Sequence, residues 1–372
     1  MWKIVKRGLF LILVAGVSMF LFIVVYFYTS PRLGGSIDSN RAIEYEQSNN
    51  YQNGKFINTV ETTMSNPPFS AMWDVLAGVP NAEPNGQIET DVFDQSKYIK
   101  NSNDSTTKIT WFGHSSVLVQ IDGQNILLDP VFSKRASMFT FMGPERYDYR
   151  YHITVEDLPK IDAVLISHDH YDHLDYETFI QLKTKVARFY VPLGVGVHLE
   201  EWGIPKNQIT ELDWWEEAKL KGIALTLTPT RHFSGRGIND RYSTLWGAWA
   251  INGNNGNLFF GGDSGYFDGF KKIGEQMGPF DFAMLECGQY SQYWPNIHMM
   301  PEETAQAGDD LNASHVMPIH WGKYTLSIHS WIEPVERFTE ASKDYEYNTI
   351  VPELNRTFAL NGTNYISDWW RE

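Results

Sequence analysis

The 372-residue sequence contains a single cysteine, Cys287. One thiol excludes an intramolecular disulfide and a cysteine-based zinc cluster. Positive charge is also scarce, with 30 Lys and Arg against 45 Asp and Glu. Four of these bases stand in the first 32 residues, which contain no acid, so the remaining chain carries 26 bases, 45 acids and a net charge of −19. A protein body with this net negative charge repels the phosphate backbone of a nucleic acid. The sequence therefore predicts no nucleic-acid partner, and any anionic substrate requires a local cation.

Charge is absent from residues 8–28, an apolar run that follows three bases near the N-terminus. A helix over this run would be roughly 30 Å long, enough to cross a bilayer and longer than the core of a signal peptide, which is about 7–15 residues. Tyr26 and Tyr28 lie where the membrane–water interface is expected, and aromatic residues are typical of that position. No A-x-A cleavage pattern follows them, so an uncleaved anchor is favoured over a cleaved signal peptide. The N-terminal bases predict a single-pass membrane protein whose residues 1–32 form a cytoplasmic tip and anchor, with the body of the protein extracytoplasmic.

Residues 33–105 are polar and rich in Asn, Gly and Ser, which predicts a stalk and a covering segment. Residues 106–372 alternate between short apolar runs and helix-like stretches and are expected to form the main folded domain. Asp122-Gly123 between two apolar runs is a hairpin signal. Strands in pairs with helices on their outer faces predict a layered α/β sandwich. The expected strands are residues 109–112, 117–121, 126–128, 163–166, 224–228, 258–260 and 282–285, and the expected helices are residues 176–185, 269–277, 302–311 and 331–343.

The most informative segment follows the strand expected at residues 163–166. It places three imidazoles and two carboxylates within six positions, including His168, His170, Asp172 and His173. Imidazole nitrogens and carboxylate oxygens suit a zinc-type divalent ion where thiolates are missing. Because the chain has only 11 histidines, a chance H-x-H-x-D-H is expected on the order of 10⁻³ times, so solvated loop histidines are the weaker interpretation.

This H-x-H-x-D-H segment resembles the signature of the metallo-β-lactamase-fold hydrolases. Segments that resemble the family's remaining ligands follow in the family's order, each after an apolar run, and contain His232, Asp263 and His320. The resemblance implies a four-layer αββα metallo-β-lactamase sandwich. It also implies two divalent metal ions, zinc being favoured, one held by His168, His170 and His232, the other by Asp172, His173 and His320, and both bridged by Asp263.

Within this family the chain is similar to the branch that contains N-acyl-phosphatidylethanolamine-hydrolysing phospholipase D. That likeness implies that His298 lies at the substrate, and the resemblance assigns all metal positions to other residues. The same branch includes sugar-phosphate lactonases. The resemblance covers roughly residues 105–345, and the segments that carry the likeness to this branch are residues 54–60, 111–116, 128–133, 143–147 and 295–298.

Residues that flank the ligand segments have two interpretations each. His114 either contacts a metal ligand or binds loop backbone. Asp129 is expected to orient a ligand histidine, with a simple turn former as the alternative. Arg231 and Lys323 either meet an anionic substrate or form surface ion pairs.

Other histidines and aromatic segments are expected in structural roles. His315 and His329 are predicted to be loop or core histidines. The Trp214-Trp215 pair and the Met138–Met142 segment are predicted to be core, with the lining of an acyl-chain site as the alternative.

Together these features predict a membrane-anchored, dinuclear metal-dependent hydrolase. We expect a phosphodiesterase of the phospholipase D type that acts on N-acyl phospholipids, with Asp172, Asp263 and His298 in catalytic roles. Its partner is then a membrane lipid or small-molecule substrate, and the oligomeric state is left open. One alternative is a lactonase or amidase that uses the same metal site. The other is a non-catalytic, membrane-tethered interaction protein that keeps the metal for structure.

Overall fold

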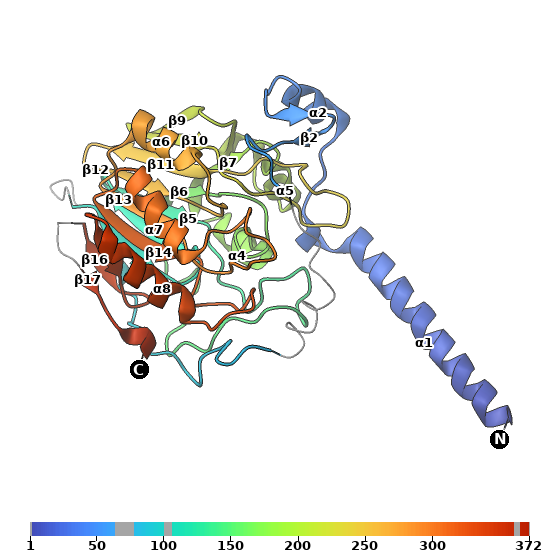
Figure 1. Cartoon of the computed structure of the whole chain (residues 1–372). Coiled ribbons are helices and arrows are strands. Elements are labelled where there is room, and N and C mark those ends of the chain that lie inside the picture. Colours follow the sequence, from blue (N-terminus) through green and yellow to red (C-terminus); the bar gives the residue numbers. More distant parts are fainter. Residues whose placement is uncertain (1, 64–77, 100–105, 361–364, 372) are drawn as a thin grey trace.

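Two β-sheets packed face to face form the centre of the computed structural model, which describes residues 2–63, 78–99, 106–360 and 365–371 (Figure 1). The first sheet has seven strands in the order β16-β3-β4-β5-β6-β7-β8. The predicted hairpin joins β4 to β5, where Asp122 and Gly123 have φ values of 50° and 69°, as a type I′ turn requires. The strands of this sheet are β3 (Lys108–Trp111), β4 (Val117–Ile121), β5 (Gln124–Leu128), β6 (Ile161–Leu165), β7 (Val186–Pro192), β8 (Ile209–Leu212) and β16 (Thr357–Ala359).

The second sheet has eight strands in the order β17-β15-β14-β13-β12-β11-β10-β9. β12, β13 and β14 pair in parallel, and β11 is antiparallel to both β10 and β12. The carboxyl ends of β10, β12, β13 and β14 therefore lie at the same edge of the sheet. The strands are β9 (Glu217–Leu220), β10 (Ile223–Thr228), β11 (Ala248–Gly253), β12 (Gly256–Phe260), β13 (Phe282–Glu286), β14 (His315–Ile319), β15 (Asn348–Val351) and β17 (Tyr365–Ile366).

The central strands are buried on both faces, which explains why they read as continuous apolar runs in the sequence. In β4, Val117 and Val119 pack into the core between the sheets, whereas Leu118 faces the core beneath the outer helices. In β12, Leu258 faces the core between the sheets and Phe259 faces outward. Alternate residues of one strand thus contribute to different cores.

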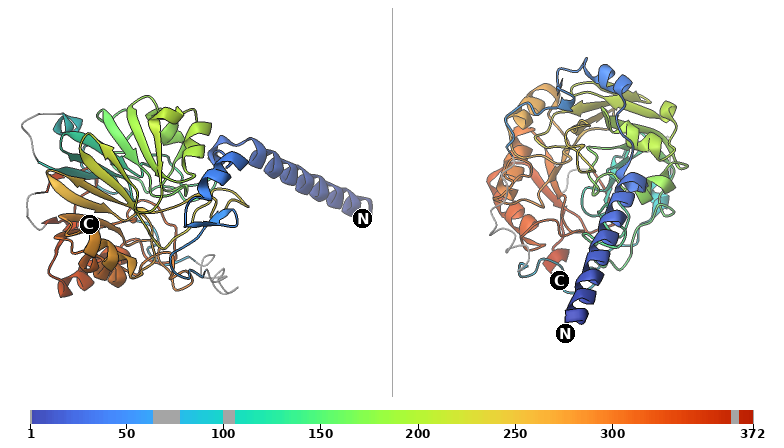
Figure 2. Two further views of the ribbon diagram at one scale, coloured as in Figure 1. Left: turned by 90° about the horizontal axis from the view of Figure 1, so that it is seen from above. Right: turned by 90° about the vertical axis from the view of Figure 1, so that its right-hand side faces the viewer.

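Helices cover the outer face of each sheet, which confirms the expected αββα sandwich (Figure 2). α4 and α5 pack on the seven-stranded sheet, for example through Phe179 and Leu199. α6, α7 and α8 pack on the eight-stranded sheet, for example through Phe270 and Phe338. The helices are α4 (Tyr176–Leu182), α5 (Gly196–Glu201), α6 (Gly269–Met277), α7 (Pro301–Asp310) and α8 (Glu333–Ala341), with short 3-10 helices η1 (Pro31–Leu33), η2 (Gln95–Tyr98), η3 (Lys206–Gln208), η4 (Ser342–Asp344) and η5 (Trp369–Arg371).

α1 (Trp2–Thr29) projects away from the sandwich (Figures 1 and 2). Its Val5–Thr29 segment is long and apolar enough to cross a membrane, and none of it is buried within the structure. The helix thus contains the whole apolar run expected at residues 8–28 and continues past both ends of it.

The described part of the segment after α1, for which a stalk and a covering segment are predicted, lies against the sandwich. Tyr45, Tyr51 and Phe56 are buried in the core between the sheets. Further along, Asn58 Nδ2 donates to the carbonyl oxygen of His232, at 2.8 Å, so this segment braces a candidate metal ligand. Residues 64–77 and 100–105 lie outside the described residues, and the domain boundaries at residues 32 and 105 remain predictions. The elements of this segment are α2 (Ser39–Tyr45), β1 (Tyr51–Gln52) and β2 (Lys55–Phe56).

Candidate metal centre

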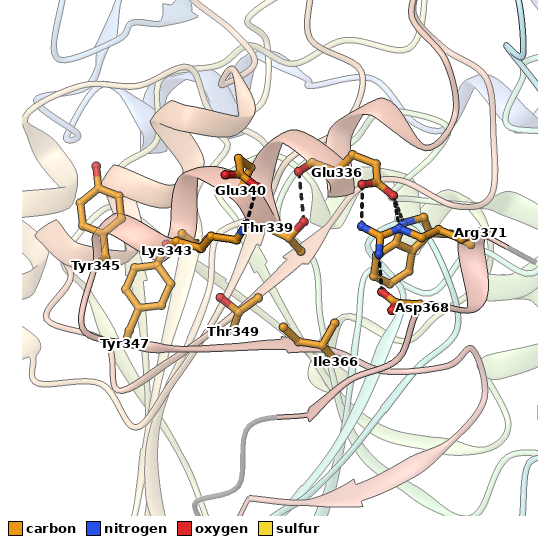
Figure 3. Close-up of a pocket in the computed structure, with 12 residues that line it drawn as sticks. Glu336, Thr339, Glu340, Lys343, Tyr345, Tyr347, Thr349, Ile366, Asp368 and Arg371 are labelled. Atoms are coloured by element: carbon orange, nitrogen blue, oxygen red, sulfur yellow. Dashed lines mark hydrogen bonds and ion pairs between the residues drawn. The ribbon is translucent and has the colours of Figure 1, made fainter.

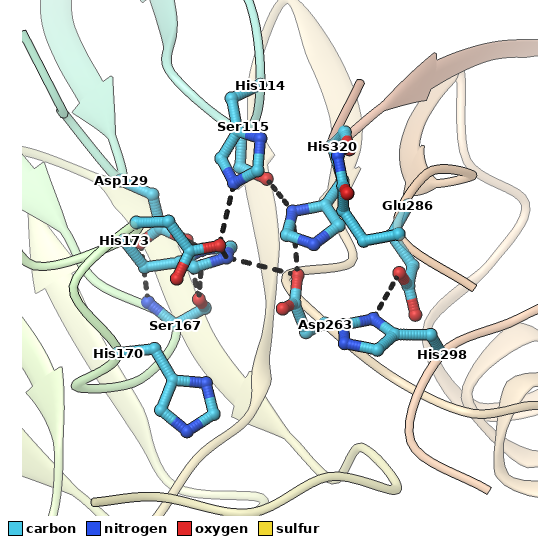
Figure 4. Close-up of polar contacts among 12 residues, drawn as sticks. His114, Ser115, Asp129, Ser167, His170, His173, Asp263, Glu286, His298 and His320 are labelled. Atoms are coloured by element: carbon cyan, nitrogen blue, oxygen red, sulfur yellow. Dashed lines mark hydrogen bonds and ion pairs between the residues drawn. The ribbon is translucent and has the colours of Figure 1, made fainter. Parts of the chain in front are cut away.

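The predicted ligands come from strand ends in both sheets (Figure 4). β6 leads into the histidine-rich loop that begins at Ser167, while β10, β12 and β14 lead to His232, Asp263 and His320. Gly262 allows the two sheets to approach here, because its φ is +55° and a Cβ at this position would lie 2.6 Å from the Cβ of Ser167. Only glycine meets both conditions without strain.

Three residues around the site have left-handed backbone conformations. The φ values are 54° for His114, 36° for Asp129 and 67° for His320. Such conformations are uncommon for residues other than glycine, have an energetic cost of the order of 1 kcal/mol each, and concentrate at functional sites. The surrounding fold therefore holds these three side chains in directions that local backbone preference alone would not select.

Four side chains form the first cluster, in which one ligand atom from each lies within 4.8 Å of the others: His168, His170, His232 and Asp263. His170 Nδ1 lies 2.8 Å from His168 Nε2 and 3.3 Å from His232 Nε2. Asp263 Oδ2 is 3.7 Å from the Nε2 atoms of both His168 and His232. The structure thus brings together the residues that the resemblance assigns to one ion.

The second cluster contains Asp172, His173 and His320, with His114 at its side. Asp263 Oδ1 is 3.2 Å from His173 Nε2 and 3.2 Å from His320 Nδ1. The two oxygens of Asp263 therefore face different clusters, as a bridging ligand requires. His114 Nε2 lies 2.8 Å from Asp172 Oδ2, so the first of the two interpretations of His114, contact with a ligand, holds.

The donor set fits divalent cations. His232 Nδ1 donates to the carbonyl oxygen of Ile297 at 2.8 Å, and His173 Nδ1 donates to the Asp129 carboxylate at 2.7 Å. The Nε2 atoms of both histidines therefore face the clusters. His173 Nε2 and Asp263 Oδ1 are buried without a hydrogen-bond partner. Acceptor atoms crowded together in a buried site need a cation to compensate them.

Burial sets the charge states of the clusters. It lowers the pKa values of His168, His232 and His320 well below the ordinary histidine value, so these rings are neutral near pH 7, the state that ligates a metal. Burial raises the pKa of Asp263 to about 6. Burial also acts to raise the pKa of Asp172, but the neighbouring His173 and His114 outweigh it and hold that pKa well below its usual range.

Polar groups behind the ligands fix their orientation. Asp129 accepts hydrogen bonds from His173 Nδ1 and from the Ser167 backbone N–H, both at 2.7 Å, which confirms its expected role in orienting a ligand histidine. Ser115 Oγ lies 3.1 Å from His320 Nδ1. No sequence motif marks either serine. The only signal for them is that each stands next to a candidate histidine in the chain.

His298 borders both clusters without belonging to either of the two ligand sets. Its ring centroid is 5.2 Å from that of His232 and 5.3 Å from that of His320, and its Nδ1 lies 2.8 Å from Glu286 Oε2. Glu286 is fully buried, which raises its pKa well above the usual value, and its other oxygen accepts two backbone N–H groups at 3.0 and 3.1 Å. Both oxygens of Glu286 are thus engaged, so it positions His298. No sequence motif marks this glutamate.

The remaining candidates bind backbone or other rings. His315 Nδ1 lies 3.0 Å from a backbone carbonyl oxygen, and the His329 ring stacks on Tyr290 with centroids 4.4 Å apart, in agreement with their expected structural roles. Arg231 donates to backbone carbonyl oxygens at 2.8 and 3.2 Å, and the buried Lys323 does so at 2.6 and 3.2 Å. Among the described residues neither base forms a surface ion pair, the second of its two interpretations, because each is used to hold neighbouring loops.

The two aromatic segments differ in outcome. Trp214 is buried as expected, and its Nε1 donates to the Trp246 carbonyl oxygen at 2.5 Å. The core prediction for Met138–Met142 is wrong, since Phe141 is 61% exposed and Met142 is 54% exposed. Apolar composition alone does not distinguish a core segment from an apolar surface.

A surface cleft of about 460 Å³ lies beneath α8, away from the metal centre (Figure 3). Its charged side chains are engaged with one another. Glu336 binds Arg371, Arg371 also binds Asp368, and Lys343 binds Glu340. The cleft therefore presents paired charges and no group comparable to those at the strand ends.

Comparison with known proteins agrees with this geometry. Residues 124–321 match the family model "Beta-lactamase superfamily domain". An uncharacterized Mycobacterium tuberculosis protein, Rv0906, is 39% identical over 351 residues, covering 92% of each chain. N-acyl-phosphatidylethanolamine-hydrolyzing phospholipase D 1 of Caenorhabditis elegans is 36% identical over 244 residues, covering 62% of this chain and 68% of the relative. The structure of Igni18, a metallo hydrolase from Ignicoccus hospitalis, superposes with a TM-score of 0.53 at 25% identity, over 69% of this chain and all of that chain.

The chain belongs to the β-lactamase superfamily and is a metal-dependent hydrolase of the metallo-β-lactamase fold. Within that class it resembles the N-acyl-phosphatidylethanolamine-hydrolysing phospholipases D.

Proposed function

We propose that this hydrolase is a membrane-anchored phosphodiesterase that cleaves N-acylated glycerophospholipids in the manner of a phospholipase D. The position of Asp263 between two ligand clusters, with His298 beside both, carries the proposal. A phosphodiester is anionic, and the body of this protein is strongly acidic, so a cationic centre is needed to bind it. Similarity to the Caenorhabditis elegans phospholipase supports the choice of substrate.

The imidazole-rich donor set favours two zinc ions as the resident metals. Ions held by these clusters would supply a nucleophile from water at neutral pH and would offset the negative charge that develops on the phosphoryl group. Asp263 fixes the separation of the clusters, because each of its oxygens faces one of them. Asp172 completes the second cluster, and His114 holds its carboxylate in place.

His298 is the group that we assign to the substrate. Glu286 holds its Nδ1, which leaves Nε2 as the nitrogen available to the site. From this position Nε2 contacts a phosphoryl oxygen or delivers a proton to the leaving oxygen. Burial lowers the pKa of His298.

We further propose that α1 crosses the membrane once, with the N-terminus in the cytoplasm and the catalytic domain on the outer side. Lys3, Lys6 and Arg7 at the N-terminal end of α1 and the length of the Val5–Thr29 segment support that topology,. Protease added to intact cells should then digest the catalytic domain. Complete protection of the domain, with digestion only after lysis, would reverse the topology.

Two other functions compete with this one. A lactonase or amidase would use the same clusters, since an ester or amide carbonyl also develops negative charge during attack. A non-catalytic tethered protein would keep the metal for structure. Catalysis is favoured because no hydrogen bond from the described residues engages His298 Nε2 and because polar groups lie behind every cluster,.

Turnover of three substrates by one preparation separates these functions. We expect hydrolysis of N-acyl-phosphatidylethanolamine in mixed micelles, slower hydrolysis of a chromogenic phosphodiester, and no lactone turnover. The same assays on His298→Ala test the histidine that we assign to the substrate. The matched control is His152→Ala, a histidine whose side chain is 31% exposed. Preferred turnover of a lactone would reject the phosphodiesterase assignment, and no turnover of any substrate by the metal-loaded protein would favour the tethered protein.

A further inference from the structure

We propose that the Met138–Met142 loop, which we call the apolar loop, inserts into the same bilayer as α1 and forms a second membrane contact of the catalytic domain. The inference rests on the proposed function in one respect, because it takes Val5–Thr29 as the membrane span.

The apolar loop exposes large side chains next to each other. Phe141 is 61% exposed and Met142 is 54% exposed. Single exposed apolar residues are common on soluble proteins, but adjacent ones at a loop tip mark an interaction surface.

The apolar loop also contacts α1 over the last two turns of the helix. The Tyr26 hydroxyl donates to the Met138 carbonyl oxygen. The Phe139 ring lies 4.7 Å from the Tyr26 ring, and the Phe141 ring lies 6.4 Å from the Phe22 ring, between centroids. The loop therefore runs along the helix toward its apolar middle, and does not stop at its end.

These contacts indicate how deep the apolar loop lies in the membrane. Phe22 is seven residues before Thr29, the end of the span, which places it roughly 10 Å further into the membrane at a rise of about 1.5 Å per residue. The 25 residues of Val5–Thr29 extend roughly 37 Å, so a core of about 30 Å leaves only a few ångströms of helix in each headgroup layer. Phe141, at the level of Phe22, therefore lies below the headgroups.

The junction between α1 and the domain is clamped, so the loop keeps this position. Trp202 Nε1 donates to the Pro31 carbonyl oxygen at 2.7 Å. Arg32 donates to the Ser137 carbonyl oxygen at 3.2 Å, just before the apolar loop. Arg236 donates to the Arg32 carbonyl oxygen at 2.7 Å. The helix, the loop and the domain therefore move together.

The same clamp connects the membrane contact to the metal centre. Arg236 Nη1 donates to the backbone carbonyl oxygen of Asp169 at 2.6 Å, and Asp169 stands between the candidate ligands His168 and His170. Insertion of the apolar loop thus fixes the height of the metal centre above the lipid surface, which is what an enzyme with a membrane-embedded substrate requires.

The position of the apolar loop beside the membrane span selects a lipid bilayer as the occupant over a protein partner, because Phe141 packs against Phe22 within Val5–Thr29. A cavity of about 440 Å³ beside Thr140 has bases in its lining, but Arg32 pairs with Glu177, and Lys134 and Arg135 pair with Glu145. The contact with the bilayer is therefore assigned to the apolar side chains.

Fluorescence of single labelled cysteines in the full chain tests the proposal. Cys287 is fully buried, so introduced cysteines at the surface react selectively, and the unsubstituted chain measures any background. The probe is a polarity-sensitive dye at Phe141→Cys, at Val14→Cys in the middle of α1, and at Ile99→Cys. Ile99 is 69% exposed and follows η2. η2 contacts the start of β3, and the metal centre lies beyond the other end of that strand, so a dye at position 99 reports on a surface remote from the site.

The labelled proteins are reconstituted in phosphatidylcholine and phosphatidylethanolamine vesicles with or without lipids that carry a spin label on the acyl chain. We expect the dyes at positions 14 and 141 to lose at least about half of their fluorescence to the spin label, and the dye at position 99 to lose almost none. A quenched position 14 with an unquenched position 141 would overturn the proposal and leave the anchor intact. An unquenched position 14 would remove the span and the proposal together. Turnover of N-acyl-phosphatidylethanolamine added to the same vesicles reports separately on the proposed function.

Discussion

Replacing Asp129 with asparagine should weaken metal binding while leaving the fold in place. Asp129 Oδ2 accepts from His173 Nδ1 at 2.7 Å and from Ser167 Oγ at 2.5 Å, and Oδ1 accepts from the Ser167 N–H at 2.7 Å. An amide has one acceptor oxygen, so its NH₂ group must face either the Ser167 N–H or the His173 Nδ1–H. In the second case the proton moves to His173 Nε2, which then cannot ligate. Changes in such outer contacts weaken metal affinity about 10–100-fold, or about 1.4–2.7 kcal/mol.

Competition with a chelator, followed by elemental analysis, measures this affinity. The matched control is Asp162→Asn, because Asp162 is also buried and its Oδ2 accepts the Asn125 N–H at 2.9 Å near the start of β6, at the end of the strand remote from the metal centre. That variant should lose stability and keep its metal affinity. Unchanged affinity in Asp129→Asn would refute the role of Asp129. An equal loss in both variants would attribute the effect to general unfolding.

Three further outcomes follow from the site. His298→Ala should lower kcat by about 10²–10⁴ and retain the metal; loss of metal would make His298 a ligand. Asp263→Asn should lower turnover by at least about 10², and an active variant would mean that the bridge is misassigned. Burial lowers the pKa of Lys323 to about 7, from 10.5, so the unfolded chain binds more protons between these values. The free energy of unfolding should rise with pH in that window, by up to about 1.4 kcal/mol per pH unit. Denaturant titrations should show a shallower rise in Lys323→Met, and equal slopes would contradict the assignment.

The sequence predicts the αββα layers because alternate residues of each strand face different cores and so produce short apolar runs. It predicts the ligand loop because His168, His170, Asp172 and His173 stand within six positions. The remaining ligands are recognised through the resemblance, and the structure shows why they can act together, since their strands end at one edge of the sandwich. α5 escapes prediction because its six residues begin with glycine and have no helical period.

Features that depend on tertiary contacts are missed because the residues in contact are separated along the chain. Glu286 ends an apolar strand, and only the fold brings its carboxylate to His298. Lys323 looks like a surface base because its carbonyl partners lie 211 and 192 residues away in the chain. The Met138–Met142 loop has the composition of a core segment, and its position beside α1 is visible only in three dimensions.

Metal analysis and phospholipid turnover on one preparation of the full chain test the proposed function most directly. The account predicts about two divalent ions per chain and hydrolysis of N-acyl-phosphatidylethanolamine that is lost on chelation and restored by zinc. A content below about 0.5 divalent ions per chain, with no activation when metal is added, would contradict it.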